Sequence, residues 1–546
     1  MTAAIQILVV LVLVASGYRI WRRLRYFMHV FQLEGYKTHE FSSWLTGIGK
    51  RTILLKEHVA ASILLFGFLA LTTNNAGAWL VAVALAIWLI VLGSARKYRS
   101  DDAKKPLAFT PRMLRLTGTV TVLSLIVLVG AGSVVLVGFE WPAALLSALL
   151  VVDLVAPYAV LAGGKAAQPI ETNIQNGFKH SAHQKLEAST DLTVIGITGS
   201  YGKTSVKFAV AEILSRRFSI LATPGSYNTP MGISKVVNNN LRTSHQFLIL
   251  EMGARYPGDI KELCEIARPD VAVLTTIGVA HLETMGSADA ILQTKAELVE
   301  YMKEGGAVVA NFDDDGVMRI ARSAHGPVIT ASIRSPEADI VAGNISYDIE
   351  GCRFVVTMGA EREEMHSTLL GAHNVANILL GLGVGSLFGL RLRQMKHAVT
   401  RLRPIPHRLQ LRQEGPITVI DDSFNSNPVG ARNAVDILGR FRTGNRIIVT
   451  PGMVELGSSQ DDENRKLGRF MAEHVDLAVL VGPSQTEPIR EGLMAAGFRE
   501  DSIMVCQSLF EARDLLQDRL LPGDVVLYEN DLPDQYSEQA ASSKQH

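Results

Sequence analysis

The chain has 546 residues, of which 53 are basic and 53 are acidic, so its formal net charge at pH 7 is zero. This balance gives no electrostatic reason to expect nucleic acid as a partner, and the length allows three or four domains. Apolar residues make up 48% of the chain, which is high for a soluble enzyme, and they concentrate before about residue 165. Three widely separated cysteines, Cys264, Cys352 and Cys506, indicate neither a disulfide framework nor a zinc knuckle.

Residues 1–165 are predicted to form a transmembrane region of about five helices, with the N-terminus outside. The predicted spans are 1–18, 58–73, 77–94, 116–138 and 141–163. Lys and Arg gather in the two loops that would face inward, whereas the two short outer loops have none. This pattern predicts a multi-pass protein of the cell (inner) membrane, surrounded by lipid, with its catalytic domains in the cytoplasm. The alternatives are a re-entrant pair in place of the second and third spans, which would reverse the N-terminus, or a hydrophobic soluble domain.

Asp153 lies inside the fifth predicted span, where a carboxylate is costly in lipid. Two interpretations are open for it. The residue serves a function within the membrane, or it packs in the interior of the helix bundle against a hydroxyl group.

A glycine-rich run follows the apolar stretch 192–197 and precedes a predicted helix. The run is Gly199-Ser200-Tyr201-Gly202-Lys203-Thr204-Ser205. In such a turn the glycines let backbone N–H groups approach phosphate oxygens, the lysine reaches the terminal phosphates, and the threonine hydroxyl ligates Mg²⁺. Ile197 stands where the commonest form of this motif has its first glycine, so the alternative is an ordinary strand-to-helix turn. With the strand before it, the run predicts a nucleoside triphosphate site.

Short apolar strands alternate with helical segments beyond residue 163, which predicts a mostly parallel sheet covered on both faces. The strands are expected at 192–197, 219–222, 247–251, 271–275 and 307–310. Sites in such sheets lie at the carboxyl ends of the strands. Glu251 ends one strand and His281 follows another, so both are candidate metal ligands beside Lys203. A structural role is the alternative for His281.

A second α/β unit is predicted after Pro404 and Pro406, which mark a hinge. Its strands are expected near 417–421, 446–450, 477–482 and 524–528, and its helices near 430–440, 461–474 and 487–497. The alternation is Rossmann-like, but the dinucleotide glycine fingerprint is missing, so we expect no nicotinamide cofactor.

Several ordered motifs over about residues 190–530 resemble the Mur ligase family, the ATP-dependent amide-forming enzymes of cell-wall peptide synthesis. The resemblance is strongest to the UDP-N-acetylmuramoyl-tripeptide:D-alanyl-D-alanine ligase branch. The motifs are Ile197–Ser205, Thr223–Asn228, Glu251–Ala254, Ala280–Glu283, Lys295–Glu297, Gly371–Asn377, His407–Arg408, Asp421–Pro428 and Gly452–Gly457. The resemblance implies α/β domains after the predicted α-helical membrane region: a P-loop parallel-sheet central domain, 190–403, and a Rossmann-like C-terminal domain, 404–535.

The resemblance also assigns roles to individual residues. ATP would be bound by Gly199, Ser200, Tyr201, Gly202, Lys203, Thr204 and Ser205, with Asn377, Arg408 and Asp422. Two Mg²⁺ ions would be held by Thr204, Glu251, His281 and Lys295, the last as a carbamylated lysine. The catalytic residues would be Lys203, Lys295 and His281, and the substrate-binding residues Asn228, Asn425, Asn427 and Glu455.

The implied activity is an ATP-dependent ligase that forms an acyl phosphate and then an amide bond. It would add an amino acid or a dipeptide such as D-Ala-D-Ala to a cell-wall (peptidoglycan) precursor that is UDP- or lipid-linked. One departure is Glu529-Asn530-Asp531, where the branch usually has Lys-Gly-Ser, which fits an amine of different charge. The alternatives are a poly-γ-glutamate-type capsule ligase and, in another class, an ATP-energised membrane transporter.

Overall fold

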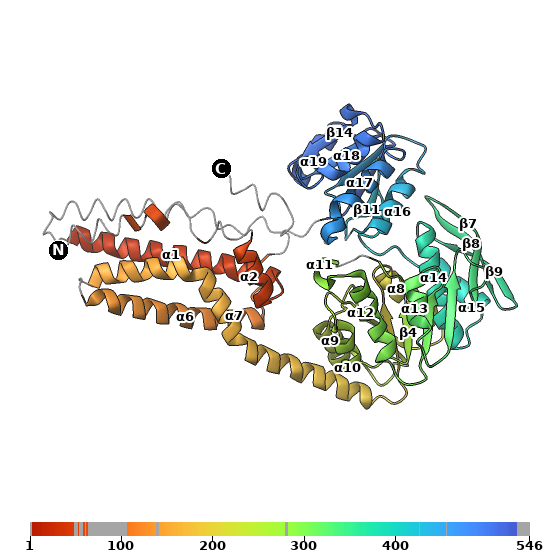
Figure 1. Ribbon diagram of the computed structural model, residues 1–546, viewed down its shortest axis with the longest axis horizontal. Coiled ribbons are helices and arrows are strands. Elements are labelled where there is room, and N and C mark those ends of the chain that lie inside the picture. The colour runs from red at the N-terminus through yellow and green to blue at the C-terminus, as the bar shows by residue number, and fades with distance from the viewer. Residues whose placement is uncertain are drawn as a thin grey trace. The chain divides into compact units, whose positions relative to one another are not determined.

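The computed structural model describes residues 3–47, 53, 58–60, 62–63, 106–137, 141–278, 282–424, 426–454 and 456–531 (Figure 1). The chain divides into two compact units, Met1–Gln175 and Asn176–His546. The described part of the first unit is helical, and the second unit contains two sheets with helices around them. The predicted order of a helical region followed by α/β structure is therefore confirmed, while the predicted domain boundaries and the P-loop and Rossmann-like descriptions stay predictions.

The first unit contains the helices α1 (Ala3–Leu33), α2 (Thr38–Thr46), α6 (Pro111–Leu136) and α7 (Trp141–Glu187), the last of which ends in the second unit. Three of these helices, α1, α6 and α7, are longer than the predicted spans, and α2 is a short helix that was not predicted. Thr110 caps α6 by accepting a hydrogen bond from the Met113 N–H at 3.2 Å. Among the described residues, Pro111–Leu136 and Ala144–Glu187 are long and apolar enough to cross a membrane. The predicted spans at 58–73 and 77–94 lie almost entirely outside the described residues.

Asp153 is buried among the helices of the first unit, where its partners are basic. Its Oδ2 atom accepts from Arg19 Nε at 2.9 Å and lies 3.0 Å from His58 Nε2. Among the described residues, these partners are basic side chains and not the hydroxyl that was expected, because α1 continues as one helix past residue 18 and brings Arg19 into the bundle.

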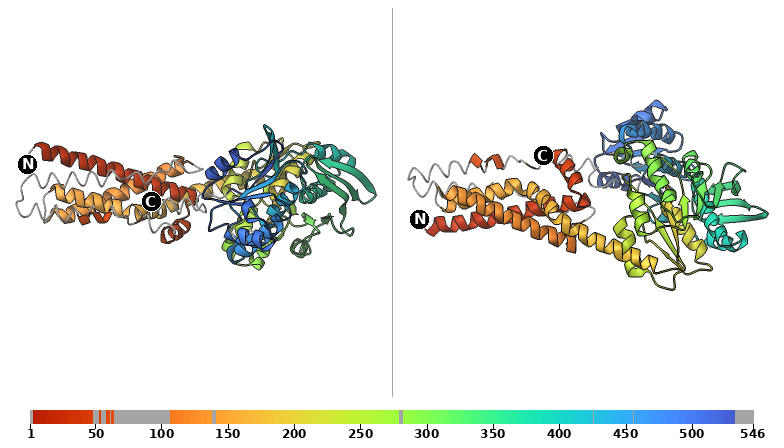
Figure 2. Two further views of the ribbon diagram at one scale, coloured as in Figure 1. Left: turned by 90° about the horizontal axis from the view of Figure 1, so that it is seen from above. Right: turned by 60° about the horizontal axis from the view of Figure 1, so that its bottom comes forward.

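Nine strands of the second unit form one sheet in the order β2-β3-β1-β4-β5-β6-β7-β8-β9. Figure 2 shows helices around the strands of this unit in two further views. The strands are β1 (Thr193–Thr198), β2 (Ile220–Ala222), β3 (Phe247–Glu251), β4 (Val271–Leu274), β5 (Ala307–Asn311), β6 (Val328–Ser332), β7 (Ile340–Asp348), β8 (Gly351–Met358) and β9 (Glu361–Ser367). The pairs from β2 to β7 are parallel, which confirms the five predicted strands. The strands β6 and β7 and the antiparallel strands β8 and β9 were not predicted.

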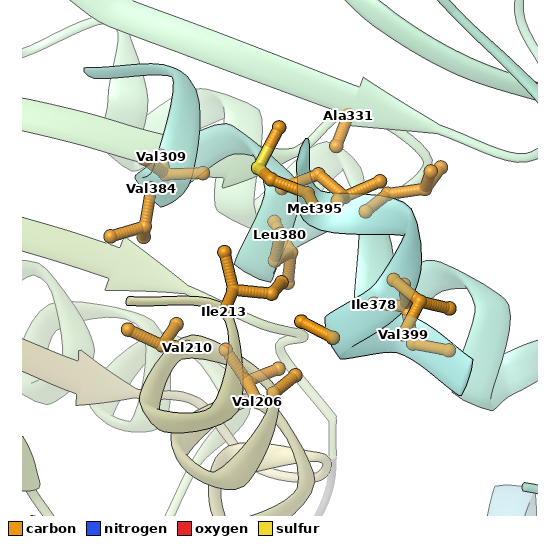
Figure 3. Packing of buried hydrophobic residues seen from close by; sticks show 14 of the residues in the cluster. Val206, Val210, Ile213, Val309, Ala331, Ile378, Leu380, Val384, Met395 and Val399 are labelled. Atoms are coloured by element: carbon orange, nitrogen blue, oxygen red, sulfur yellow. The ribbon is translucent and has the colours of Figure 1, made fainter. Parts of the chain in front are cut away.

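Helices cover both faces of this sheet, and one layer positions the glycine-rich loop. Figure 3 shows Val206, Val210 and Ile213 of α8 packed with Ile378 and Val384 of α14. The helices on this face are α8 (Lys203–Leu214), α14 (Ala372–Leu387) and α15 (Leu392–Arg401). The opposite face carries α9 (Pro230–Asn240), α10 (Asp259–Ile266), α12 (Ala288–Glu300) and α13 (Asp315–Ala321), and the short helix α11 spans Leu282–Met285.

The second sheet has the order β10-β11-β15-β12-β13-β14, with only β10 antiparallel. Its strands are β10 (Gln410–Glu414), β11 (Ile417–Asp422), β12 (Arg446–Thr450), β13 (Leu477–Val481), β14 (Ile503–Cys506) and β15 (Val525–Glu529). Its helices are α16 (Pro428–Leu438), α17 (Gln460–Met471), α18 (Glu487–Ala495) and α19 (Leu509–Gln517), with the 3₁₀ turns η2 (Gly457–Ser459) and η3 (Glu500–Ser502). The four predicted strands and three predicted helices are confirmed within a few residues, whereas β10, β14 and α19 were not predicted.

Candidate functional site

The glycine-rich run forms a tight loop between β1 and α8. Gly199 and Gly202 have φ angles of +150° and +80°, which side chains rarely permit. A Cβ atom on Gly199 would lie 1.9 Å from Thr275 Oγ1, and one on Gly202 would lie 2.6 Å from Asn377 Oδ1. Only glycine fits at these two positions, so the backbone itself lines the turn.

Side-chain and backbone hydrogen bonds hold this loop to the chain that follows β4. The Ser200 N–H donates to the Thr276 carbonyl at 2.6 Å, and the Ser200 hydroxyl contacts the Gly278 carbonyl at 3.0 Å. Tyr201 presents its carbonyl to the Thr275 hydroxyl at 2.5 Å. These contacts fix the loop at the carboxyl ends of β1 and β4, as predicted for the site.

The Lys203 ammonium folds back onto its own loop. It donates to the carbonyls of Gly199 at 2.7 Å and Ser200 at 3.0 Å. Burial and the positive charge of Arg408 lower the pKa of Lys203 to about 8, while the charge of Glu251 opposes the shift. Thr204, which follows it, is buried in the first turn of α8, and Ser205 beside it is half-buried.

Glu251 ends β3 and is only 2% exposed, with both carboxylate oxygens engaged. Oε2 lies 3.1 Å from the Lys207 ammonium, and Oε1 accepts from Asn228 Nδ2 at 3.1 Å. Asn228, predicted to bind substrate, therefore contacts the predicted metal ligand in this structure.

Lys295 lies on α12 and is 3% exposed. Burial and the charge of Lys203 lower its pKa to about 7, so a substantial fraction of this amine is neutral at physiological pH. The electrostatic influence of Lys203 shows that the sheet brings the two predicted catalytic lysines near each other.

Arg408 and Asp422 bring charges from the second sheet. The Arg408 guanidinium lies 4.5 Å from the centre of the Phe424 ring. Burial lowers the pKa of Arg408, and the negative charges of Glu251 and Asp422 oppose that shift. Burial and the charge of Glu529 raise the pKa of Asp422 to about 7, although its Oδ1 accepts from the Leu409 N–H at 3.1 Å.

The remaining predicted residues are placed differently. Asn377 Nδ2 lies 3.4 Å from Asn374 Oδ1, and Asn377 also borders Gly202. Asn427 caps α16, with its Oδ1 accepting from the Gly430 N–H at 2.9 Å. His281, Asn425 and Glu455 lie outside the described residues, so their predicted roles stay predictions.

The residues present fit a triphosphate and a magnesium ion. Lys203 now donates to loop carbonyls, and phosphate oxygens are stronger acceptors for the same ammonium. The part of the chain that the structure describes has no group of three or more His, Cys, Asp or Glu that would hold a metal ion. Magnesium commonly binds through one or two carboxylates together with substrate phosphates and water, and Glu251 with Thr204 suits that mode.

Two features of the site were missed in the sequence. Lys207 follows Lys203 by four residues, which places both on one face of α8, and this spacing would have revealed it. The second is the burial of Glu529, whose carboxylate accepts from the Ser426 and Thr450 hydroxyls. It lies opposite Asp422 in the parallel pairing of β11 and β15.

Comparisons with known proteins agree with this arrangement. Residues 197–385 match the Mur ligase middle domain, and residues 407–528 match the Mur ligase glutamate ligase domain. The UDP-N-acetylmuramoyl-tripeptide–D-alanyl-D-alanine ligase of Mycobacterium tuberculosis is 34% identical over 358 residues, covering 62% of this chain and 70% of that protein.

Two solved structures are similar. MurF from Acinetobacter baumannii gives a TM-score of 0.60 with 25% identity, over 68% of this chain and 81% of that one. MurF ligase from Thermotoga maritima in complex with ADP gives 0.59 with 26% identity, over 68% and 83%. The matched proteins are Mur-type ATP-dependent ligases, which form a carbon–nitrogen bond between an acid and an amino acid. The chain belongs to the Mur ligase family.

Proposed function

We propose that the chain is a membrane-bound Mur ligase that joins D-alanyl-D-alanine to the peptide of a peptidoglycan precursor through an acyl phosphate. The observation that carries the proposal is the gathering of Lys203, Arg408 and the buried Glu251 beside the glycine-rich loop. The relative from Mycobacterium tuberculosis, named for this reaction, is matched over 70% of its length. Membership of the family also removes the support for an ATP-energised transporter.

In the proposed reaction, a carboxylate oxygen of the precursor attacks the γ-phosphorus of ATP. The bond from this phosphorus to the bridging oxygen breaks, giving ADP and an acyl phosphate. The nitrogen of the incoming amine then attacks the acyl carbon, phosphate leaves, and the nitrogen loses a proton. Lys203 and Arg408 offset the negative charge that would otherwise keep the carboxylate from the phosphates. Such positioning and charge compensation account for most of the catalysis of phosphoryl transfer.

Thr204 and Glu251 would hold one Mg²⁺, and His281 with a carbamylated Lys295 would hold the second. Magnesium supplies further charge neutralisation at the phosphates. A carbamate forms only from a neutral amine, which bonds CO₂ through nitrogen and loses a proton. The pKa of about 7 that burial gives Lys295 supports this assignment, because it makes the neutral amine available.

The membrane part of the proposal depends on the first unit. On α6, Val122, Ile126, Val129 and Val134 are 57–75% exposed, and a helix in water would gain by covering them. The matched family domains begin at residue 197, so this unit lies outside them. We infer that it anchors the ligase and that the catalytic unit works on a UDP- or lipid-linked precursor at the cytoplasmic face.

The test measures ADP release by detergent-purified protein with Mg²⁺ and ATP. UDP- and lipid-linked tripeptide precursors are each combined with D-Ala-D-Ala, other amines or glutamate, and the products are identified by mass spectrometry. Addition of D-Ala-D-Ala to one precursor supports the proposal and identifies the carrier. Chains of glutamate would support the capsule-ligase alternative, and ATP turnover without an amide product would contradict ligation of these substrates.

Matched lysine variants make the test specific for the site. Lys203→Met should remove product formation, because the phosphates lose their nearest cation. Lys235→Met, at an exposed position on α9, should leave it unchanged.

A further inference from the structure

Lys207 is a fully buried cation near the site, and the proposed reaction gives it no role. Its side chain is 0% exposed, and its ammonium lies 3.1 Å from Glu251 Oε2 and donates to the Gly225 carbonyl. Because Asn228 Nδ2 donates a hydrogen bond to Oε1, both carboxylate oxygens of Glu251 have partners within this chain.

This arrangement has a direct electrostatic consequence for metal binding. A buried carboxylate is costly without a positive partner, and Lys207 supplies that partner. A divalent cation that binds Glu251 meets the Lys207 charge at short range, in a site that water screens poorly. The lysine is fixed on α8 with its stem buried, so it cannot move its charge into solvent.

We propose that Lys207 is a positioning residue whose ammonium lies beside Glu251 where the divalent cation would bind. It neutralises and orients the carboxylate in the metal-free enzyme and opposes binding of the metal alone. Nucleotide phosphates bring the negative charge that offsets this repulsion, so the metal enters together with ATP. The inference rests on the metal role of Glu251 in the proposed function.

The test is a titration of the purified full chain with Mn²⁺ in the absence of nucleotide. Binding is monitored by electron paramagnetic resonance. Lys207→Met should bind Mn²⁺ roughly tenfold or more tightly than the wild type, because one positive charge near the ion is gone. Lys207→Arg, which keeps the charge, and Lys235→Met on exposed α9 should bind it as the wild type does. A double variant, Lys207→Met with Glu251→Gln, should lose the gain. Equal or weaker Mn²⁺ binding by Lys207→Met overturns the inference.

A second variant covers the case in which Lys207→Met does not fold. Lys207→Gln keeps a hydrogen-bond donor for Glu251 but has no charge. Mn²⁺ should raise its thermal unfolding midpoint more than it raises that of the wild type, and an equal increase would contradict the role of Lys207.

The same titration with a non-hydrolysable ATP analogue tests the metal role of Glu251 separately. Weaker Mn²⁺ binding by Glu251→Gln supports that role. If Glu251→Gln is weakened but Lys207→Met gains nothing, only the inference about Lys207 fails. Unchanged binding by Glu251→Gln would refute the metal role itself.

Discussion

Replacing Asp422 with asparagine should stabilise the fold at pH 8 while weakening nucleotide binding. Burial and the neighbouring charge of Glu529 raise the pKa of Asp422 from 3.8 to about 7. A folded-state pKa above the unfolded value means that the native protein holds a proton that the unfolded chain has released. Stability is therefore lost as pH rises from about 4, and the loss is complete above about pH 7.

The magnitude follows from the size of this pKa difference. A shift of about three pH units corresponds to about 4 kcal/mol, and the partial exposure of Asp422 reduces the expected effect to about 2–4 kcal/mol. For a unit as large as Asn176–His546, that is about 2–5 °C in the unfolding midpoint. Asparagine keeps the oxygen that accepts from the Leu409 N–H, so this hydrogen bond should survive.

The assay is thermal unfolding of the wild type and Asp422→Asn at several values between pH 5 and pH 8. The midpoint of the variant should rise relative to the wild type as pH increases, and its affinity for an ATP analogue should fall. Asp514→Asn, on the exposed face of α19, should give a difference that stays constant with pH. A midpoint for Asp422→Asn that falls below the wild type at pH 8 would refute the reasoning.

Three further outcomes are expected. Gly199→Ala should weaken binding of an ATP analogue by at least about tenfold in calorimetry, because its Cβ atom would lie 1.9 Å from Thr275 Oγ1. The control Gly343→Ala, whose Cβ atom would have nothing within 4 Å, should bind the analogue as the wild type does. Tyr347→Phe removes the hydroxyl that donates to Asp436 at 3.1 Å and accepts from Arg440 at 2.9 Å, and should lower stability by about 0.5–1.5 kcal/mol in thermal unfolding; no change would show that these bonds contribute nothing. The full chain should stay in the membrane pellet after alkaline carbonate extraction, and its release into the supernatant would contradict the anchor.

Strand positions were predictable wherever a parallel strand is buried on both faces. β3 reads Phe-Leu-Ile-Leu-Glu and is buried throughout, so its apolar run stands out and its terminal carboxylate is placed at the sheet edge. β9 reads Glu-Arg-Glu-Glu-Met-His-Ser, with only Met365 and Ser367 buried, and local composition gives no sign that it pairs with β8. Antiparallel pairing at the side of the sheet lets the charged residues of β9 face solvent, which is why β9 escaped prediction.

The motifs predicted candidate residues for the site but not the contacts that these residues make. Glu251 and Asn228 belong to different motifs, and their 3.1 Å contact depends on how β3 and the chain after β2 come together. The counter-ion of Glu251 lies within the first motif's helix, four residues after Lys203. Partnerships of this kind depend on tertiary geometry, which the order of motifs along the chain does not encode.

The pKa shifts at the two sheets share a cause, burial of the charged group, and this supports a ligand-binding role. Burial lowers the pKa of Lys203 and Lys295 in the first sheet and raises the pKa of Asp422 and Glu529 in the second. In each case the charged form is less favourable in the protein than in water, so these groups reduce the stability of the fold at neutral pH. Stability alone would favour apolar or neutral side chains at these positions. Under the proposed function, ATP phosphates would compensate the charge of Lys203, and carbamylation would convert Lys295 into an anionic metal ligand.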